Sequence, residues 1–270
     1  MPGQTKTLIA TVNFLVLIFG WQTADAQILK VFTEPYETIR VATAEPGRVG
    51  EVFVQLGDVV KHGDLIVSLD NRVLDQTRKL ATAKANARGS LEFAESELQL
   101  KSNRLEKYKS VQSEGFAGKV ELEIAKSELA SAQARWQAAL DEQTQNQLEV
   151  ARIDAMIEQR QVRSPIDGVV IQLNHKTGEY ISSNEPETAV IVDLSRLRAK
   201  FYLLTEQAEK LAAGQRVNLR LLQDDKPVAG VIKYLAPVTS ADSLTVEVDV
   251  VIDNQQNQIR SGVPVRIELE

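Results

Sequence analysis

The chain of 270 residues contains no cysteine, and it has few aromatic residues, histidines or methionines. Without cysteine it has neither disulfides nor thiolate metal ligands, so its stability must come from the burial of apolar side chains. Its two histidines, His62 and His175, are far apart in the sequence, and two methionines cannot supply a methionine-rich site for a soft metal. We therefore expect neither a metal site nor a cofactor.

The charge balance and the lack of catalytic motifs argue against two further classes of function. The formal net charge is −6, which leaves no excess of basic residues for nucleic acid or for a polybasic membrane anchor. No Ser/His/Asp spacing, phosphate-binding loop or HExxH stretch occurs in the sequence. We therefore predict a protein that is not an enzyme and has no nucleic-acid partner.

Residues 1–26 have the pattern of an export signal. Lys6 supplies a positive charge, residues 8–21 are mostly apolar, and Ala24-Asp25-Ala26 offers small residues for cleavage. The apolar run is shorter than the roughly 20 residues that span a bilayer. We expect a signal peptide cleaved near Ala26 and a mature chain in the periplasm. The alternative is an uncleaved N-terminal anchor.

A short β motif occurs twice, on either side of a long helical segment. Each copy is a strand, a glycine-centred turn and a second strand, so we expect its glycines to form structural turns. These glycines are Gly47, Gly57 and Gly63 in the first copy and Gly168 and Gly178 in the second. Residues 27–70 and 162–192 would combine into one split domain. The pair resembles the lipoyl carrier fold, but no lysine for a cofactor lies between Lys61 and Lys79.

Residues 71–161 carry the spacing of two long helices. In each, core positions recur alternately every three and four residues, which is typical of a left-handed coiled coil. The first ladder is Leu80, Lys84, Ala87, Leu91, Ala94, Leu98, Lys101, Leu105 and Tyr108, and the second is Leu122, Ala125, Leu129, Ala132, Trp136, Ala139, Gln143, Asn146, Val150, Ile153 and Ile157. The short tip at residues 114–118 makes the helices antiparallel. We expect Asp70 to cap a first helix from Arg72 to about Ser113, and Gly118 to cap the second.

Residues 193–270 are predicted to form a small β-barrel with one helix. Strand-like segments occur at residues 198–204, 217–222, 228–235, 244–252 and 263–269. A helix is expected from Thr205 to about Gly214. The predicted fold class is therefore mainly β, with a split lipoyl-like (barrel-sandwich hybrid) domain, a C-terminal β-barrel and a long antiparallel coiled-coil hairpin.

In their order and spacing these segments resemble the periplasmic adaptors of the membrane fusion (HlyD-like) family. The resemblance is carried by residues 57–66 and 163–170, by Leu69-Asp70 at the hairpin entrance, and by residues 260–265. It implies an adaptor that links an inner-membrane transporter, of the resistance–nodulation–division (RND) type, to an outer-membrane TolC-like channel of a tripartite efflux pump. It also implies a homo-oligomer, in the form of a hexameric ring, that is associated with the inner membrane through the transporter.

Many members of this family carry an arginine, a leucine and a serine at successive intervals of seven residues near the hairpin tip, and these residues engage the channel. The corresponding residues here are Arg104, Val111 and Gly118, so two of the three positions differ. The resemblance makes Arg104, Val111, Phe116 and Gly118 the candidate partner-binding residues. Many members also have a fourth, membrane-proximal domain, which we expect to be absent because the chain stops just after the barrel.

Three alternatives stay open. An adaptor of an ABC-type exporter or of a type I secretion system would usually have an N-terminal membrane span and a longer hairpin. A carrier domain of an enzyme complex would be revealed by lipoylation or biotinylation in an intact-mass measurement. A periplasmic coiled-coil scaffold would leave drug sensitivity unchanged when it is deleted.

Overall fold

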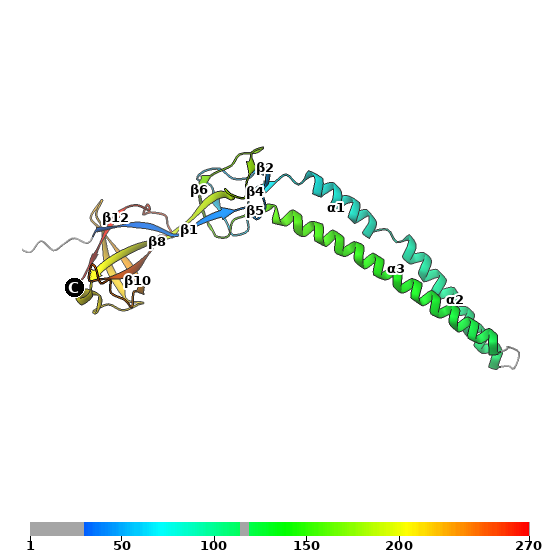
Figure 1. The fold of residues 1–270 in the computed structure, drawn as a ribbon. Coiled ribbons are helices and arrows are strands. Elements are labelled where there is room, and N and C mark those ends of the chain that lie inside the picture. Colours follow the sequence, from blue (N-terminus) through cyan, green and yellow to red (C-terminus); the bar gives the residue numbers. More distant parts are fainter. Residues whose placement is uncertain (1–29, 114–118, 270) are drawn as a thin grey trace, which may run out of the picture.

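The computed structural model of the chain describes residues 30–113 and 119–269. Figure 1 shows three parts in a line, namely a β-barrel that contains the C-terminus, a second β body, and a helical hairpin that projects away from both. Within the described residues, no helix is both long enough and apolar enough to cross a bilayer.

Twelve strands and four helices make up these parts. The strands are β1 (Lys30–Ala42), β2 (Gly47–Val52), β3 (Val59–Val60), β4 (Leu65–Leu69), β5 (Gln161–Arg163), β6 (Gly168–Leu173), β7 (Tyr180–Ile181), β8 (Glu187–Leu204), β9 (Arg216–Leu221), β10 (Lys226–Leu235), β11 (Thr245–Asp253) and β12 (Pro264–Glu268). The helices are α1 (Arg72–Ala85), α2 (Gly89–Ser113), α3 (Lys119–Gln159) and α4 (Thr205–Ala208).

The barrel is a closed sheet of six strands, not the five that were predicted. Its order is β1-β12-β9-β10-β11-β8, and β1 closes it by pairing with β8. The sixth strand is the start of β1, whose residues 30–32 pair with β12 and residues 33–35 with β8. Val31 packs against the barrel core and Thr33 is buried. Residues 30–35 are therefore part of the barrel, because their alternate side chains fill its interior.

The predicted helix after Thr205 is shorter than expected. It ends at Ala208, and residues 209–215 continue as turns to β9. Ala208 alone in this helix is buried in the barrel core. One buried residue cannot stabilise a longer helix, since helical stability in proteins comes mainly from packing of an apolar face.

The second β body joins segments from both sides of the hairpin. Its four-stranded sheet has the order β5-β4-β2-β7, so β4 before the hairpin pairs with β5 after it. Strand β3 pairs with β6 in the same way. The two halves share one core, which includes Val49, Ile66, Val170, Ile181 and Ile191. Because its halves meet, this body returns the chain to the place where the hairpin began.

Strands β1 and β8 run through both β parts without interruption. Their pairing extends from Thr33 opposite Ala199 in the barrel to Ala42 opposite Glu187 in the second body. The register shifts between Pro35 and Glu37, at the junction of the two parts. A boundary at residue 192 therefore falls inside β8, and two strands rather than a loop connect the barrel to the second body.

The hairpin consists of α3 on one side and of α1 followed by α2 on the other (Figure 1). The prediction of one continuous first helix is wrong, because residues 86–88 lie between α1 and α2. Asn86 caps α1 with its backbone N–H on the Thr82 carbonyl, and Gly89 opens α2. Asparagine and glycine both have poor helix propensity, and together they favour this interruption.

The interruption changes which side chains of α1 face α3. Ala81 and Ala85 are buried, whereas the predicted core residues Leu80 and Lys84 are exposed. The predicted ladder is therefore displaced by one position in α1. On α2 and α3 the predicted ladders do contain the buried residues, which are Ala94, Leu105, Ala125, Ala132 and Ile153. The predicted cap also moves by one residue, since the helix starts after Asn71 and the Asp70 carboxylate accepts from the Arg72 backbone N–H at 3.1 Å.

Candidate functional site

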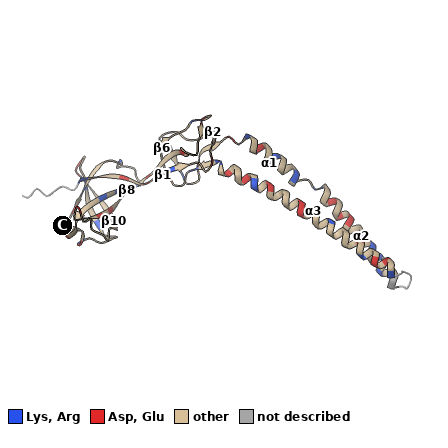
Figure 2. Ribbon diagram, viewed as in Figure 1, with Lys and Arg blue, Asp and Glu red and all other residues tan. Residues whose placement is uncertain are grey.

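The first candidate site is a group of charged side chains near the outer end of the hairpin. The Glu128 carboxylate accepts hydrogen bonds through one oxygen from both Arg104 (3.0 Å) and Lys101 (3.1 Å). The bond from Lys101 and the charge of Arg104 lower the pKa of Glu128. The guanidinium of Arg104 also lies 5.6 Å from the centre of the Tyr108 ring. Arg104 therefore joins α2 to α3 within this chain. Figure 2 shows acidic and basic residues interspersed along all three hairpin helices.

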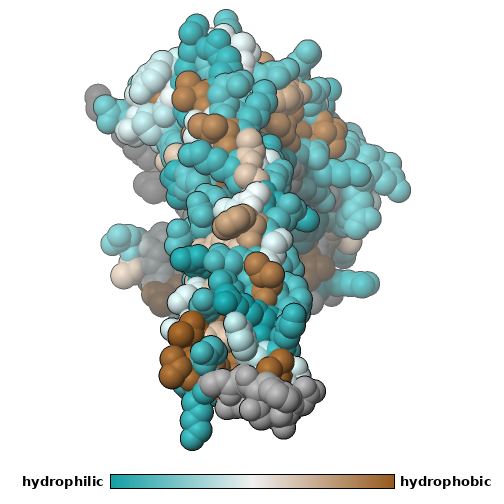
Figure 3. All heavy atoms as spheres, turned by 90° about the vertical axis from the view of Figure 1, so that its right-hand side faces the viewer, coloured by the Kyte–Doolittle hydropathy of each residue, from teal (hydrophilic) through white to brown (hydrophobic). Residues whose placement is uncertain are grey.

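Only one of the other three predicted partner-binding residues lies in the described part of the chain. Val111 is half-buried on α2. Phe116 and Gly118 lie outside the described residues, as does the predicted cap at Gly118. Instead Val120 and Ile124, in the first turns of α3, are exposed by 68% and 52%. Figure 3, which looks at the end of the hairpin, shows apolar surface beside the tip. Neither residue belongs to the predicted core ladder, and this is the feature of the sequence that could have indicated their exposure.

A second candidate feature is the set of predicted glycine turns in the second β body. Gly57, Gly63 and Gly178 have φ near +90°, a region that L side chains rarely adopt. Each of their N–H groups donates to the other half of the body. Gly57 donates to Val170 (2.8 Å), Gly63 to Ser164 (2.8 Å) and Gly178 to Val49 (2.9 Å). These turns therefore hold the two halves together.

The acidic residue after each of these glycines closes its turn. The carboxylate of Asp58 accepts from the Gln55 N–H at 2.7 Å, and that of Asp64 from the Lys61 N–H at 2.8 Å. Glu179 accepts from the Lys176 N–H at 2.9 Å in the same way. The sequence predicted turns at these glycines but not the role of the acidic residues that follow them. Each pair forms the same closed turn, because side-chain oxygens satisfy backbone donors that the turn leaves free.

Gly47 and Gly168 are not turn residues, which corrects the prediction for these two positions. Each is the first residue of a strand, β2 and β6 respectively. A Cβ at Gly168 would lie 2.5 Å from the Val192 carbonyl oxygen, and one at Gly47 would lie 3.1 Å from the Leu69 side chain. Glycine is required at Gly168 because the backbone of β8 approaches closely, whereas at Gly47 the nearest atoms are the ends of the Arg160 and Leu69 side chains.

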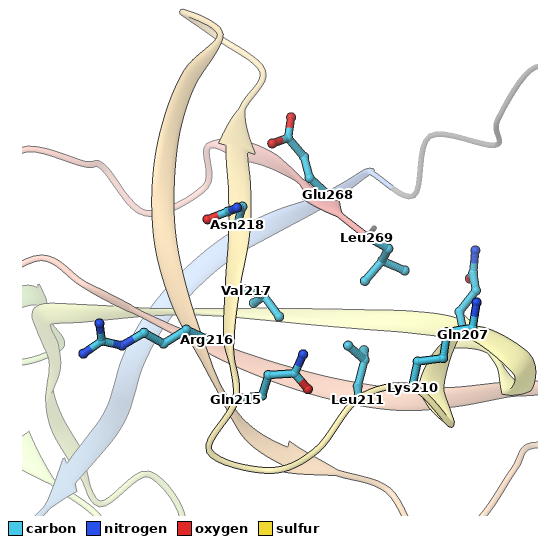
Figure 4. Close-up of a pocket in the computed structure, with 9 residues that line it drawn as sticks. All are labelled: Gln207, Lys210, Leu211, Gln215, Arg216, Val217, Asn218, Glu268 and Leu269. Carbon is cyan, nitrogen blue, oxygen red and sulfur yellow. The ribbon is translucent and has the colours of Figure 1, made fainter.

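A third candidate feature is a cavity of about 410 Å³ at the end of the barrel that lies away from the hairpin. It is lined by Gln207, Lys210, Leu211, Gln215, Arg216, Val217, Asn218, Glu268 and Leu269. Figure 4 shows that Arg216 points away from Lys210, so the two cations do not converge on one point. Glu268 is already paired with Arg220 at 2.6 Å. The cavity therefore lacks a convergent set of polar groups for a small ligand.

The two histidines lie apart, His62 in the turn between β3 and β4 and His175 between β6 and the turn that contains Gly178. The backbone N–H of His62 donates to the Asp167 carboxylate at 2.7 Å, and the His175 ring lies 3.8 Å from Glu179. Among residues 30–113 and 119–269, no cluster of three or more His, Asp or Glu side chains is arranged to hold a metal ion.

The chain is similar to proteins of one family in both sequence and structure. The family described as the YknX barrel-sandwich hybrid domain matches residues 39–192, more than half of the chain. The uncharacterised protein YdhJ of Escherichia coli strain K12 is 23% identical over 238 residues, which cover 87% of this chain and 78% of YdhJ. Other curated relatives are longer, and the chain spans 41% to 54% of two of them.

Two solved structures have the same fold. The crystal structure of MacA from Actinobacillus actinomycetemcomitans has a TM-score of 0.73 at 23% identity, and the match covers 90% of this chain and 78% of MacA. The membrane fusion protein Spr0693 of Streptococcus pneumoniae R6 has a TM-score of 0.61 at 17% identity and covers 90% and 98%. The split β body, the closed barrel and the family match all point to the same fold. The chain belongs to the YknX barrel-sandwich hybrid domain family, and its resemblance to the membrane fusion proteins, the periplasmic adaptors, is confirmed.

Proposed function

We propose that this protein is a non-enzymatic periplasmic adaptor of a tripartite efflux pump. It would link an inner-membrane transporter to an outer-membrane TolC-like channel, and several copies would form a ring that encloses a path for the exported compound. We propose a hexamer. The units of each copy are the split domain (residues 27–70 and 162–192), the hairpin (71–161) and the barrel (193–270), with residues 30–35 added to the barrel.

The observation that carries this proposal is the separation of two surfaces along one elongated molecule. The hairpin end and the pole of the barrel with the cavity lie at opposite ends of the chain (Figure 1). Each end has exposed apolar side chains, Val120 and Ile124 on the hairpin and Val238 and Leu244 on the barrel. Such residues at both ends suit a protein that contacts a different partner at each.

The proposed transporter is of the RND type. A second candidate is an ABC-type exporter, and the observation that favours it is the fold similarity to MacA at a TM-score of 0.73. The two candidates differ in the protein that the barrel contacts. An experiment that identifies this protein therefore decides between them.

Single reporter cysteines test the proposal, because the chain has none of its own. Val120→Cys at the hairpin end and Val238→Cys at the barrel pole are cross-linked in intact cells, and the captured proteins are identified by mass spectrometry. We expect an outer-membrane channel from the first and an inner-membrane transporter from the second. Leu148→Cys, exposed by 64% in the half of α3 nearer the second β body, is the control and should capture neither. Capture of the same protein at both ends would contradict the proposal.

The proposed periplasmic location has its own test. Cleavage of residues 1–26 would leave a mature protein that starts at Gln27. Intact-mass measurement of the protein from the periplasmic fraction should give the mass of residues 27–270. A full-length mass in the membrane fraction would support the uncleaved anchor instead.

A further inference from the structure

Four large apolar side chains on the first arm of the hairpin have no partner within the described chain. Val73 and Leu80 on α1 are exposed by 79% and 60%, and Phe93 and Leu100 on α2 by 72% and 64%. Within each helix the two residues are seven apart, so they lie on one side of it. We call these four residues the apolar row.

The apolar row lies beside the ion pairs that join the two arms. Phe93 lies four residues before Glu97, and Leu100 lies four residues before Arg104. Side chains four residues apart are neighbours on a helix. Glu97 pairs with Arg135 at 2.7 Å and Arg104 pairs with Glu128 at 3.0 Å. On α1, Leu80 lies one turn before Lys84. The hydrogen bond from Arg152 lowers the pKa of Glu149 on α3, and the charge of Lys84 lowers it further. The row therefore follows one side of the hairpin along both α1 and α2.

The opposite side of the hairpin presents uncharged residues on α3. Gln133 comes two residues before Arg135 and Leu140 five residues after it. At 100° per residue, both therefore lie about 140–160° around the helix from Arg135. We define the uncharged row as Ala130, Gln133, Gln137, Leu140, Gln147 and Ala151. All of these are exposed except Leu140, which is half-buried. The row itself therefore adds no charge to a contact, although Gln137 donates a hydrogen bond to the Asp141 carboxylate at 2.8 Å.

The two rows lie at the same levels along the hairpin. Leu100 is midway between Glu97 and Arg104, so its level on α3 is midway between their partners Arg135 and Glu128, beside Ala130 and Gln133. Phe93 is seven residues, about two turns, further from the tip than Leu100, which brings it close to the level of Leu140.

Leu80 follows the same rule on α1. It lies two residues after Arg78, which pairs with Asp154 at 2.6 Å, so its level on α3 is close to Ala151. Three of the large side chains in the apolar row thus have small or uncharged side chains at their own level on the other side.

We propose that the apolar row of one copy packs against the uncharged row of the next copy, with the hairpins parallel and at the same level. Because the two rows lie on opposite sides, the contact is heterologous, and repeated rotation closes it into a ring. Pairing of the apolar row with itself would instead bring the glutamates beside it, such as Glu128 and Glu149, against their own copies. The inference rests on the proposed adaptor function, which requires several copies with hairpins that point the same way.

Paired cysteines test this contact in the full-length chain. Leu100→Cys and Gln133→Cys lie at one level on opposite sides, so in the double variant each copy can be joined to the next on both sides. After oxidation in intact cells we expect a ladder of dimers and larger species from the double variant and monomers from each single variant. Dimers of Leu100→Cys alone, or no ladder from the double variant, would overturn the proposal. Leu148→Cys with Gln133→Cys is the control pair.

A charge in the apolar row tests the same contact without cross-linking. Leu100 and Leu148 are the same residue type and are both exposed by 64%. Leu100→Glu should weaken self-association at least about tenfold in sedimentation, since a buried leucine is lost from the contact. Leu148 lies beside the uncharged row but is not part of it, so Leu148→Glu should weaken self-association much less, and circular dichroism should find both variants equally helical. Equal effects of the two substitutions would contradict the proposal.

These outcomes are separate from those of the proposed function. If no ladder forms while the Val120→Cys and Val238→Cys proteins capture a channel and a transporter, only the contact between rows is wrong. If the ladder forms and neither partner is captured, the adaptor function is wrong.

Discussion

The barrel and the hairpin differ in what holds them together. The barrel core has fourteen buried residues, of which only Ala199 and Ala208 are alanines. The described part of the hairpin has seven buried residues, and five of these are alanines, with Leu105 and Ile153 as the exceptions. Since the free energy of burial scales with apolar area, each buried hairpin residue contributes much less than each barrel residue. The barrel is stabilised by a core of large apolar side chains. The hairpin instead has few large buried side chains between its helices and many ion pairs across and along them.

This difference indicates that the hairpin is built to be completed by neighbours. Several of its large apolar side chains, such as Phe93 and Leu100, are on the outside, where a second copy or a partner can cover them, whereas most of its fully buried side chains are small. Small inward residues let two helices approach closely, and they leave the large residues for contacts with other chains. The following predictions test this contrast, from the largest expected effect to the smallest.

The largest effect is expected in the barrel core. Phe201 is fully buried there, whereas its neighbour Tyr202 is 50% exposed on the other face of β8. Phe201→Ala should lower the free energy of unfolding by about 3–5 kcal/mol, and Tyr202→Ala by less than about 1 kcal/mol. Urea denaturation followed by β-sheet circular dichroism measures both. Fluorescence of Trp136, which is on α3, follows the hairpin separately. Equal losses for the two variants would show that the barrel core is not the main source of stability.

The second effect concerns the close strands of the split body. A Cβ at Gly168 would lie 2.5 Å from a backbone oxygen, whereas one at Gly57 would have no heavy atom within 4 Å and would suffer only from its φ of +91°. Gly168→Ala should cost about 3 kcal/mol through overpacking, and Gly57→Ala about 1 kcal/mol through backbone strain. Thermal unfolding of the two variants compares them directly. The opposite order would mean that the strands can move apart.

The third effect is local to the hairpin. Leu105 is 7% exposed in the seam between α2 and α3. Leu105→Ala should destabilise the outer hairpin by about 2 kcal/mol and should accelerate amide hydrogen exchange there, with no change in the barrel. Leu148→Ala is the exposed control on the same hairpin. Faster exchange in the barrel as well would contradict the independence of the two regions.

The smallest effect is the pH dependence of the hairpin ion pairs. Lys101 and Arg104 lower the pKa of Glu128 below its ordinary value of 4.5. A lowered carboxylate pKa adds stability above the ordinary pKa, and this is lost as the pH falls through the lowered one. Below pH 4.5 the hairpin melting temperature, followed by Trp136 fluorescence, should therefore fall more steeply in the natural protein than in Glu128→Gln. Parallel pH profiles would mean that this exposed pair adds nothing measurable.

The sequence predicted the second arm of the hairpin well and the first arm less well. On α3, the ladder that includes Ala125, Ala132 and Ile153 is the face that packs, because no interruption disturbs its spacing. On α1 the ladder is displaced by one residue. The alternating spacing of three and four residues continues past Asn86 and Gly89 in the sequence, although the helix is interrupted there.

The sixth barrel strand could not be found from the local pattern. Residues 30–35 form a short, mixed segment, and what assigns them to the barrel is pairing with residues at the other end of the sequence. The candidate site was predicted in part for a similar reason. Arg104 was placed near the hairpin end, but the glutamate that binds it, Glu128, comes from the other helix, so identifying it requires the register between the two helices.

The closing strand of the barrel has a consequence for how the protein folds. Lys30 pairs with Arg266 and Phe32 with Pro264, so the first and last strands of the described chain are neighbours. Contacts of such high sequence separation form late, because a long chain segment must first be brought together. The barrel can close only after β12 has been synthesised. Until then, the backbone groups of residues 30–32 lack the strand with which they pair.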